Sequence, residues 1–86
     1  MTVLIEFPCQ FPIKAMGTNA PDLIPEITAI IAANCNTFNP EADIACKESV
    51  KGNYISVTAT ITATSQQQLD NIYSALNKHE LIKFTL

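Results

Sequence analysis

The residue types in this chain that could bind a metal or attack a substrate are three cysteines and a histidine. They are Cys9, Cys35, Cys46 and His79. Three thiolates and an imidazole could form a zinc site, but structural zinc sites normally take ligands from closely spaced pairs, which this sequence lacks. An odd number of cysteines without a C-x-x-C pair also speaks against a disulfide framework. We therefore expect free thiols, no metal site and no cofactor.

The same residues offer little for catalysis. We expect Cys46 to be a small buried residue on a strand, and Cys35, at a helix end, to be the more exposed thiol. His79 falls at the end of a second predicted helix and is expected to be solvated. No candidate nucleophile has a base within a recognisable motif. The sequence therefore favours a protein that is not an enzyme.

The charges argue against nucleic acid as a partner. Eight acidic residues outnumber five basic ones, which are all lysines, and the net charge is −3. The segment 51–57 resembles the RNP1 signature of RNA-recognition domains, but that signature stacks bases on aromatic side chains. Asn53 and Ile55 stand where aromatic residues would be needed. We therefore expect no nucleic-acid partner.

Length and composition predict a single folded domain. The chain has 86 residues, of which 48% are hydrophobic and 15% are charged. This is enough for one domain over residues 1–86, with an N-terminal arm over residues 1–10. No apolar run is long enough to span a membrane, and the N-terminus lacks the features of a signal peptide. We expect a soluble, cytoplasmic protein with no membrane partner.

The first elements predicted along the chain are a strand and a helix. We expect the strand to cover residues 13–16, because Pro12 cannot donate to a sheet ladder, and to end at Gly17. Pro21 and Asp22 are typical of a helix start. The helix that follows carries one apolar stripe at helical spacing. The stripe consists of Leu23, Ile27, Ile30 and Ile31.

The middle of the chain predicts a hairpin. The helix should end near residues 34–36, and after a loop we expect a charged edge strand over residues 42–50. Gly52 and Asn53 would then supply the positive φ of a tight turn. Residues 54–63 alternate between apolar and polar, mostly hydroxyl-bearing side chains, which predicts a strand with one buried face.

The last part of the chain predicts a second helix and a closing strand. Ser65 and Gln68 form a capping box, and an apolar stripe follows at helical spacing. The stripe consists of Leu69, Ile72, Tyr73 and Leu76. Residues 81–86 alternate as a strand does, with three apolar side chains expected on one face. These are Ile82, Phe84 and Leu86.

The order of these elements predicts the fold class. Strand, helix, strand, strand, helix, strand is the βαββαβ order of the ferredoxin-like fold, an α+β architecture. In this fold a four-stranded antiparallel sheet carries two helices on one face. The first and third strands are expected to be central.

Two segments of the chain, Met16-Gly17 and Lys51-Gly52-Asn53-Tyr54, together resemble a known family. They are similar to segments of the YbeD-like family, a group of small bacterial proteins of uncertain function, and the resemblance runs from Phe7 to Leu86. It implies a ferredoxin-like fold similar to that of the amino-acid-sensing ACT domains, and a link to lipoate metabolism. The chain departs from the family pattern at Ile55, where a polar residue is usual, and at Glu48-Ser49-Val50.

The loop before the first helix is one candidate site. Gly17, Thr18 and Asn19 precede a helix N-terminus, where backbone amides can bind an anion or the carboxylate of a small ligand. In the ACT resemblance the equivalent loop lies beside the amino-acid pocket. The simpler alternative is a sharp turn at Gly17, with Asn19 capping the helix.

The hairpin and the hydroxyl-bearing face of the third strand are a second candidate surface. At the hairpin we expect Lys51, Asn53 and Tyr54 to contact a partner. The hydroxyl face consists of Ser56, Thr58, Thr60 and Thr62. Such a face can simply be solvated, or it can dock another protein or a second copy of the chain.

These observations favour a small regulatory or adaptor protein that acts by binding a metabolic protein partner. Two alternatives stay open. One is a free-standing, ACT-like sensor of a small molecule such as an amino acid. The other is an enzyme subunit whose active site forms only across an oligomer interface.

Overall fold

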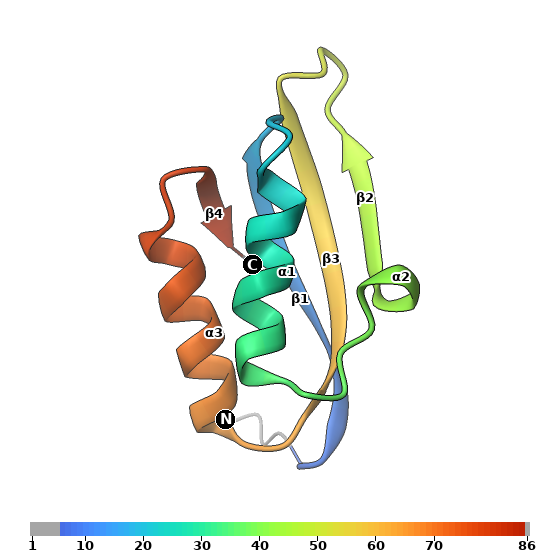
Figure 1. Cartoon of the computed structure of the whole chain (residues 1–86), viewed down its shortest axis with the longest axis vertical. Coiled ribbons are helices and arrows are strands. Elements are labelled where there is room, and N and C mark those ends of the chain that lie inside the picture. The colour runs from blue at the N-terminus through green and yellow to red at the C-terminus, as the bar shows by residue number, and fades with distance from the viewer. Residues whose placement is uncertain (1–5, 86) are drawn as a thin grey trace, which may run out of the picture.

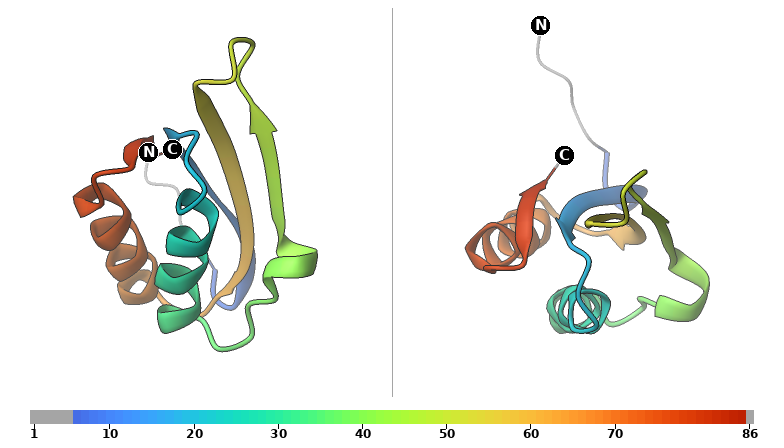
Figure 2. Two further views of the ribbon diagram at one scale, coloured as in Figure 1. Left: turned by 45° about the horizontal axis from the view of Figure 1, so that its top comes forward. Right: turned by 90° about the horizontal axis from the view of Figure 1, so that it is seen from above.

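The computed structural model describes residues 6–85, which form one antiparallel sheet and three helices. The elements are β1 (Cys9–Thr18), α1 (Leu23–Asn34), α2 (Pro40–Asp43), β2 (Ile44–Glu48), β3 (Tyr54–Ala63), α3 (Gln66–Lys78) and β4 (Ile82–Thr85). The strand order is β2-β3-β1-β4, so that β1 and β3 are central, and α1 and α3 lie on the same side of the sheet (Figures 1 and 2). This confirms the predicted ferredoxin-like α+β fold.

The strict alternation along β3 provides the sheet's share of the core. Its buried residues are Ile55, Val57, Ala59, Ile61 and Ala63. They lie in one hydrophobic cluster with the buried stripes of the two long helices. These stripes are Leu23, Ile27 and Ile31 in α1, and Leu69, Ile72 and Leu76 in α3. The predicted stripes are confirmed except that Ile30 and Tyr73 are only partly buried.

Strand β1 begins earlier than predicted. It starts at Cys9 and passes through Pro12, which lies opposite Thr60 of β3. On its other side β1 pairs with β4 only from Ala15 to Gly17. Around Pro12 the strand therefore has one neighbour, and a missing donor is tolerated there as on an edge strand. The expected arm thus overlaps β1 at its end, and its residues 1–5 lie outside the described residues.

Helix α1 accommodates the proline that its sequence contains. Pro25 lies in the first turn, where backbone amides have no intrahelical partner. Asp22 is the N-cap residue but makes no side-chain cap hydrogen bond. The alternative in which Asn19 caps this helix is wrong, because its side-chain amide donates to the carbonyl oxygen of Gly52 instead.

A short helix replaces the start of the expected extended segment 42–50. Pro40–Asp43 forms one helical turn, capped by Asn39, whose Oδ1 accepts from the N–H of Glu41 at 3.2 Å. The N–H of Asn39 donates in turn to Oδ2 of Asp43 at 3.0 Å. An asparagine cap before a proline is typical of a helix start, and this signal was missed. The strand β2 that follows lies at the edge of the sheet, as expected.

A bulge separates the apolar residues of β4. Phe84 lies opposite Met16, whereas Ile82 lies opposite the next residue, Gly17, so the register shifts by the one extra residue Lys83. As a result Ile82 is buried, at 9% exposed, and Phe84 is 48% exposed. The expectation that both side chains share one face is wrong. Leu86, the third member of that set, lies outside the described residues.

Candidate functional site

The two candidate sites predicted from sequence meet at one end of the sheet. The side-chain Nδ2 of Asn19 donates to the carbonyl oxygen of Gly52 at 2.7 Å. Its backbone N–H donates to the carbonyl oxygen of Asn53 at 3.0 Å. Thr18 lies opposite Tyr54 in the β1–β3 ladder. The loop after β1 and the hairpin between β2 and β3 therefore form a single surface.

Gly17 and Thr18 are the last residues of β1, and the backbone amides of Thr18 and of Asn19 in the following loop are used within the protein. The N–H of Thr18 donates to the carbonyl oxygen of Leu81 at 2.9 Å, while that of Asn19 reaches the hairpin. Gly17 is required by close packing, because a Cβ there would lie 2.5 Å from Leu23 Cδ1 and 2.7 Å from Leu81 O. A ligand at this loop would have to bind through groups other than these two amides.

The hairpin is held together by Ser49. Its N–H donates to Tyr54 O at 2.9 Å, its carbonyl oxygen accepts from Gly52 N at 2.9 Å, and its Oγ accepts from Tyr54 N at 3.2 Å. Gly52 has a φ of +73°, as predicted, but the same expectation for Asn53 is wrong, because no non-glycine residue in the described range has a positive φ. Lys51 and Val50 are exposed at the tip.

On the sheet face away from α1 and α3, four side chains form a row across all four strands. Lys47 of β2 lies opposite Ser56 of β3, Ser56 lies opposite Met16 of β1, and Met16 lies opposite Phe84 of β4. Directly opposed residues of antiparallel strands project to the same face. We call this face, which no described element covers (Figure 2), the open face.

A small hollow lies on the open face beside this row. Its volume is about 80 Å³, and the side chains around it belong to Lys14, Met16, Ser56, Thr58 and Phe84. Thr58 and Lys14 form a second row with Ala45 of β2, next to the first. The predicted hydroxyl residues Ser56 and Thr58 thus lie at a depression with a half-exposed aromatic ring.

The other two predicted hydroxyl residues lie in a different part of the open face. Thr60 lies opposite Pro12, and Thr62 lies opposite Gln10, where β1 has no partner in β4. The Oγ1 of Thr62 accepts a hydrogen bond from Gln10 Nε2 at 3.0 Å. The hydroxyl face predicted from sequence is therefore divided into a half with the hollow and a half without it.

The open face is cationic although the chain has a net charge of −3. Lys14 and Lys47 belong to the two rows that cross it. No carboxylate occupies an open-face position of the four strands in the described residues, since Glu48 lies opposite the buried Ile55. Lys51 is exposed at the adjoining hairpin. The acidic residues of the strands and helices therefore project elsewhere.

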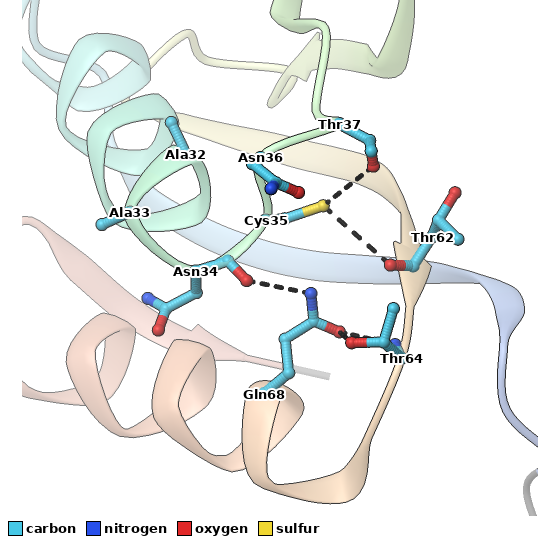
Figure 3. Close-up of a pocket in the computed structure, with 9 residues that line it drawn as sticks. All are labelled: Ala32, Ala33, Asn34, Cys35, Asn36, Thr37, Thr62, Thr64 and Gln68. Carbon is cyan, nitrogen blue, oxygen red and sulfur yellow. Dashed lines mark hydrogen bonds between the residues drawn. The ribbon is translucent and has the colours of Figure 1, made fainter.

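A second, larger pocket was not found by sequence reasoning. It has a volume of about 350 Å³ and lies where α1 ends, beside the β3–α3 connection (Figure 3). Gln68 donates from Nε2 to Asn34 O at 2.9 Å, and its Oε1 accepts from Thr64 N at 2.8 Å. Ser65 Oγ accepts from Gln68 N, as the capping box predicts, but the glutamine side chain reaches Thr64 rather than Ser65. The nine lining residues carry no charged side chain.

The exposure of two cysteines is the reverse of the expectation. Cys35 is buried at this pocket, with Sγ 3.5 Å from Thr37 Oγ1 and 3.9 Å from Thr62 O, because the chain turns back over the sheet where α1 ends. Cys46 is exposed, because the edge strand β2 extends beyond the cover of the helices. Partial burial still raises the pKa of the Cys46 thiol.

His79 is not the solvated residue that the sequence suggested. Its side chain is 22% exposed, and its Nδ1 accepts a hydrogen bond from Leu81 N at 3.2 Å. Its Nε2 lies 3.5 Å from Glu26 Oε2 in the first turn of α1. The imidazole therefore connects the end of α3 to the start of α1, which is a structural role.

Comparison with known proteins places the chain in a family. The family model described as protein of unknown function (DUF493) matches residues 2–86. The chain belongs to the DUF493 family. A UPF0250 protein of Chromobacterium violaceum is 41% identical over 83 residues, covering 96% of this chain and 92% of that protein. A UPF0250 protein of Neisseria gonorrhoeae is 41% identical over 88 residues, covering 99% and 92%. The resemblance to the YbeD-like family is thereby confirmed.

A solved structure has the same fold as this DUF493 protein. It is the solution structure of protein HP0495 from H. pylori, which matches with a TM-score of 0.78 and covers 99% of this chain and 88% of that one. The two sequences are 12% identical. The likeness therefore supports the fold and carries no argument about function.

Metal-ligand clusters and membrane-spanning helices are two further features that bear on the function of this DUF493 protein. Within residues 6–85, no group of three or more histidine, cysteine, aspartate or glutamate side chains is arranged to hold a metal ion. No helix in the same range is long and apolar enough to cross a membrane. Within the described residues, the open face with its hairpin and the pocket beside Cys35 are the two surfaces suited to binding.

Proposed function

We propose that this DUF493 protein is a regulatory or adaptor protein, not an enzyme, which acts by binding a protein partner through its open face and hairpin. One observation carries the proposal. Every large hydrophobic side chain that is exposed in residues 6–85 lies on this surface. They are Val50 at the hairpin tip, Tyr54 at the start of β3 and Phe84 on β4.

These exposed hydrophobic residues are gathered on one surface. Single exposed hydrophobic residues are normal, whereas several gathered on one surface mark an interaction site. Tyr54 and Phe84 both project to the open face, because their opposite residues, Thr18 and Met16, lie on the same side of β1. A partner that covers this surface would remove all of these apolar groups from water.

The proposed contact surface contains the residues predicted from sequence. Lys51, Asn53 and Tyr54 form its hairpin part, and Ser56 and Thr58 adjoin the hollow. Thr60 and Thr62 belong to its margin. We place this activity in the cytoplasm, and the family resemblance alone directs the first search for partners to lipoate metabolism.

Site-specific photo-crosslinking in living cells tests the proposal. A photoreactive amino acid at position 58 on the open face should yield a covalent adduct with another protein. The same amino acid at position 74, which is exposed on α3, should not. The double variant Lys51→Ala, Tyr54→Ala should weaken the adduct at position 58. Equal adducts at both positions, or none at position 58, would count against the proposal.

The pocket beside Cys35 favours a second candidate function, the small-molecule sensor. Its volume of about 350 Å³ falls within the range of roughly 300–1,000 Å³ of ligand sites. Its lining of asparagine, glutamine, threonine and cysteine suits an uncharged, hydrogen-bonding ligand. The site of such a sensor would then be this pocket rather than the loop of Gly17, Thr18 and Asn19.

A thermal-shift screen against amino acids, lipoate and common cofactors tests this candidate. A ligand at 100 times its Kd stabilises the native state by about 2.7 kcal/mol, which raises Tm by on the order of 10 °C in a protein of this size. Asn36→Ala removes a polar group from the pocket lining and should reduce a shift that arises there. A screen without any shift would count against the sensor and leave partner binding as the remaining proposal.

A further inference from the structure

We infer that the open face binds an acidic protein segment that places one apolar side chain in the hollow beside Phe84. This inference rests on the proposed function and specifies the chemistry of the partner. It combines the two lysines of the open face, the absence of carboxylates from that face in the described strands, and the small size of the hollow.

The positions of the two lysines define a charge pattern. Lys47 lies on β2 and Lys14 on β1, on either side of the central strand β3. Strands are spaced by about 4.8 Å, and the residues opposite the two lysines, Ser56 and Thr58, are about 7 Å apart along β3, so the lysine Cα atoms are roughly 12 Å apart. Ser56 and Thr58 lie on the strand between them. A segment that crosses β3 can therefore place a carboxylate near each lysine and hydrogen-bond to the hydroxyl groups between them.

The charge of the remaining molecule adds specificity. The chain has a net charge of −3, so an acidic partner is repelled by most of its surface and attracted to the face that carries lysines without carboxylates. Such complementarity orients a partner and excludes wrong docking modes. The acidic residues near the pair, such as Glu48, belong to the opposite side of the sheet.

The hollow sets the size of the apolar contact. At about 80 Å³ it is much smaller than the roughly 300–1,000 Å³ of typical small-molecule pockets. The Phe84 ring and the Met16 side chain provide its apolar wall, and Ser56 and Thr58 provide its hydroxyl groups. This size and composition suit one apolar side chain from a larger partner, whose backbone would lie over β3.

Repulsion between lysines disfavours one other occupant of this face, and the lack of aromatic side chains disfavours another. Stacking this face on a second copy would set Lys14 and Lys47 against a surface that is also cationic. Single-stranded RNA is read on a sheet face by aromatic residues of the central strands, where this chain has Ser56, Thr58 and Met16. Both occupants are nevertheless possible outcomes of the test below.

A peptide titration followed by NMR tests the inference with defined probes. A fluorescent peptide of alternating glutamate and leucine should bind, while a glutamate–serine peptide, a lysine–leucine peptide and an oligouridylate RNA should bind at least about tenfold more weakly. The amide resonances of Met16, Ser56 and Thr58 should shift, and those of α1 and α3 should not. The binding should weaken as salt is added.

Charge reversals with a matched control locate the binding site. The double variant Lys14→Glu, Lys47→Glu should weaken binding by about tenfold or more, whereas Lys78→Glu, at the end of α3, should leave it unchanged. Phe84→Ala should weaken binding of the glutamate–leucine peptide without creating any affinity for the lysine peptide. The milder pair Lys14→Gln, Lys47→Gln keeps the test valid if the double reversal fails to fold.

Several results would overturn the inference. They are equal binding of acidic and basic peptides, an equal effect of Lys78→Glu, tighter binding of the RNA, or a dimer that Phe84→Glu dissociates. A cellular adduct at position 58 together with failure of the acidic peptide would show that a partner exists but has other chemistry. Absence of the adduct would remove the proposed function itself.

Discussion

The side-chain amide of Asn19 donates a hydrogen bond to the carbonyl oxygen of Gly52 at 2.7 Å. This contact joins the loop after β1 to the hairpin between β2 and β3, segments 33 positions apart in the chain. The hairpin contains Lys51-Gly52-Asn53-Tyr54, and the loop follows shortly after Met16-Gly17, the other segment of the family resemblance. The two family segments are therefore close in space, and Asn19 connects them through its hydrogen bonds to Gly52 and Asn53.

Replacing Asn19 should loosen this connection. Asn19→Ala removes the side-chain bond to Gly52 but keeps the backbone bond to Asn53, so unfolding should become easier by about 1 kcal/mol. Urea denaturation measures the change, and hydrogen exchange at the hairpin amides should accelerate. Asn36→Ala, at an exposed loop asparagine, is the control and should change stability by only a few tenths of a kcal/mol. Equal effects of the two variants would contradict the proposed connection.

Substitution of the two glycines by alanine should reduce stability by different amounts. In Gly17→Ala the new Cβ would meet Leu23 and the backbone oxygen of Leu81 at 2.5 and 2.7 Å, and overpacking of this kind costs about 3 kcal/mol. In Gly52→Ala the nearest atom is 3.8 Å away, so only the strain of a φ of +73° remains, about 1 kcal/mol. Thermal unfolding of both variants measures their losses of stability. A larger loss in Gly52→Ala than in Gly17→Ala would show that turn conformation matters more than packing.

The parts of the fold that were predictable are those dictated by local periodicity. The ten-residue alternation of β3 and the apolar stripes of the two long helices are properties of single segments, so the sequence is sufficient to identify them. The element order then limits the topology to few choices. The ferredoxin-like fold followed from these three features.

The predictions that were wrong concern residues whose environment depends on neighbouring elements, which the sequence of a single segment does not reveal. Pro12 is accepted within β1 because β4 is too short to reach it. Phe84 and Ile82 lie on different faces because the extra residue Lys83 shifts the register between Met16 and Gly17. Cys35 is buried because the chain turns back where α1 ends, whereas Cys46 is exposed because the helices do not cover β2. The pocket at Gln68 joins three separate segments and has no signature in any one of them.

Gln68 should contribute more to stability than its neighbour Gln67. Its side chain bonds to Asn34 O at the end of α1 and to Thr64 N before α3, whereas that of Gln67 bonds to Asn71 within the same helix. Gln68→Ala should therefore cost about 2 kcal/mol and Gln67→Ala no more than about 0.5 kcal/mol. Urea denaturation gives both values. Similar costs would indicate that the link between the helices is unimportant.

The thiols of Cys46 and Cys35 should differ in alkylation by iodoacetamide. Cys46 is exposed and should react in the native state, whereas Cys35 should react only when the protein opens. Burial raises the pKa of Cys46, and the thiolate is the reactive form, so its rate should reach a plateau at higher pH in the native protein than in the urea-unfolded protein. Mass spectrometry of the labelled peptides measures both rates. Faster native labelling of Cys35 would contradict its burial.

Because of the bulge in β4, substitution of two nearby apolar residues should cost different amounts of stability. Ile82 faces the core, so Ile82→Ala should destabilise the protein by about 3 kcal/mol. Phe84 is half exposed on the open face, so Phe84→Ala should cost only about 1 kcal/mol, since about half of its side chain stays in contact with water after folding. Paired urea denaturation curves measure the difference. Comparable losses would mean that the two side chains share the core face and that Phe84 is not available to a partner.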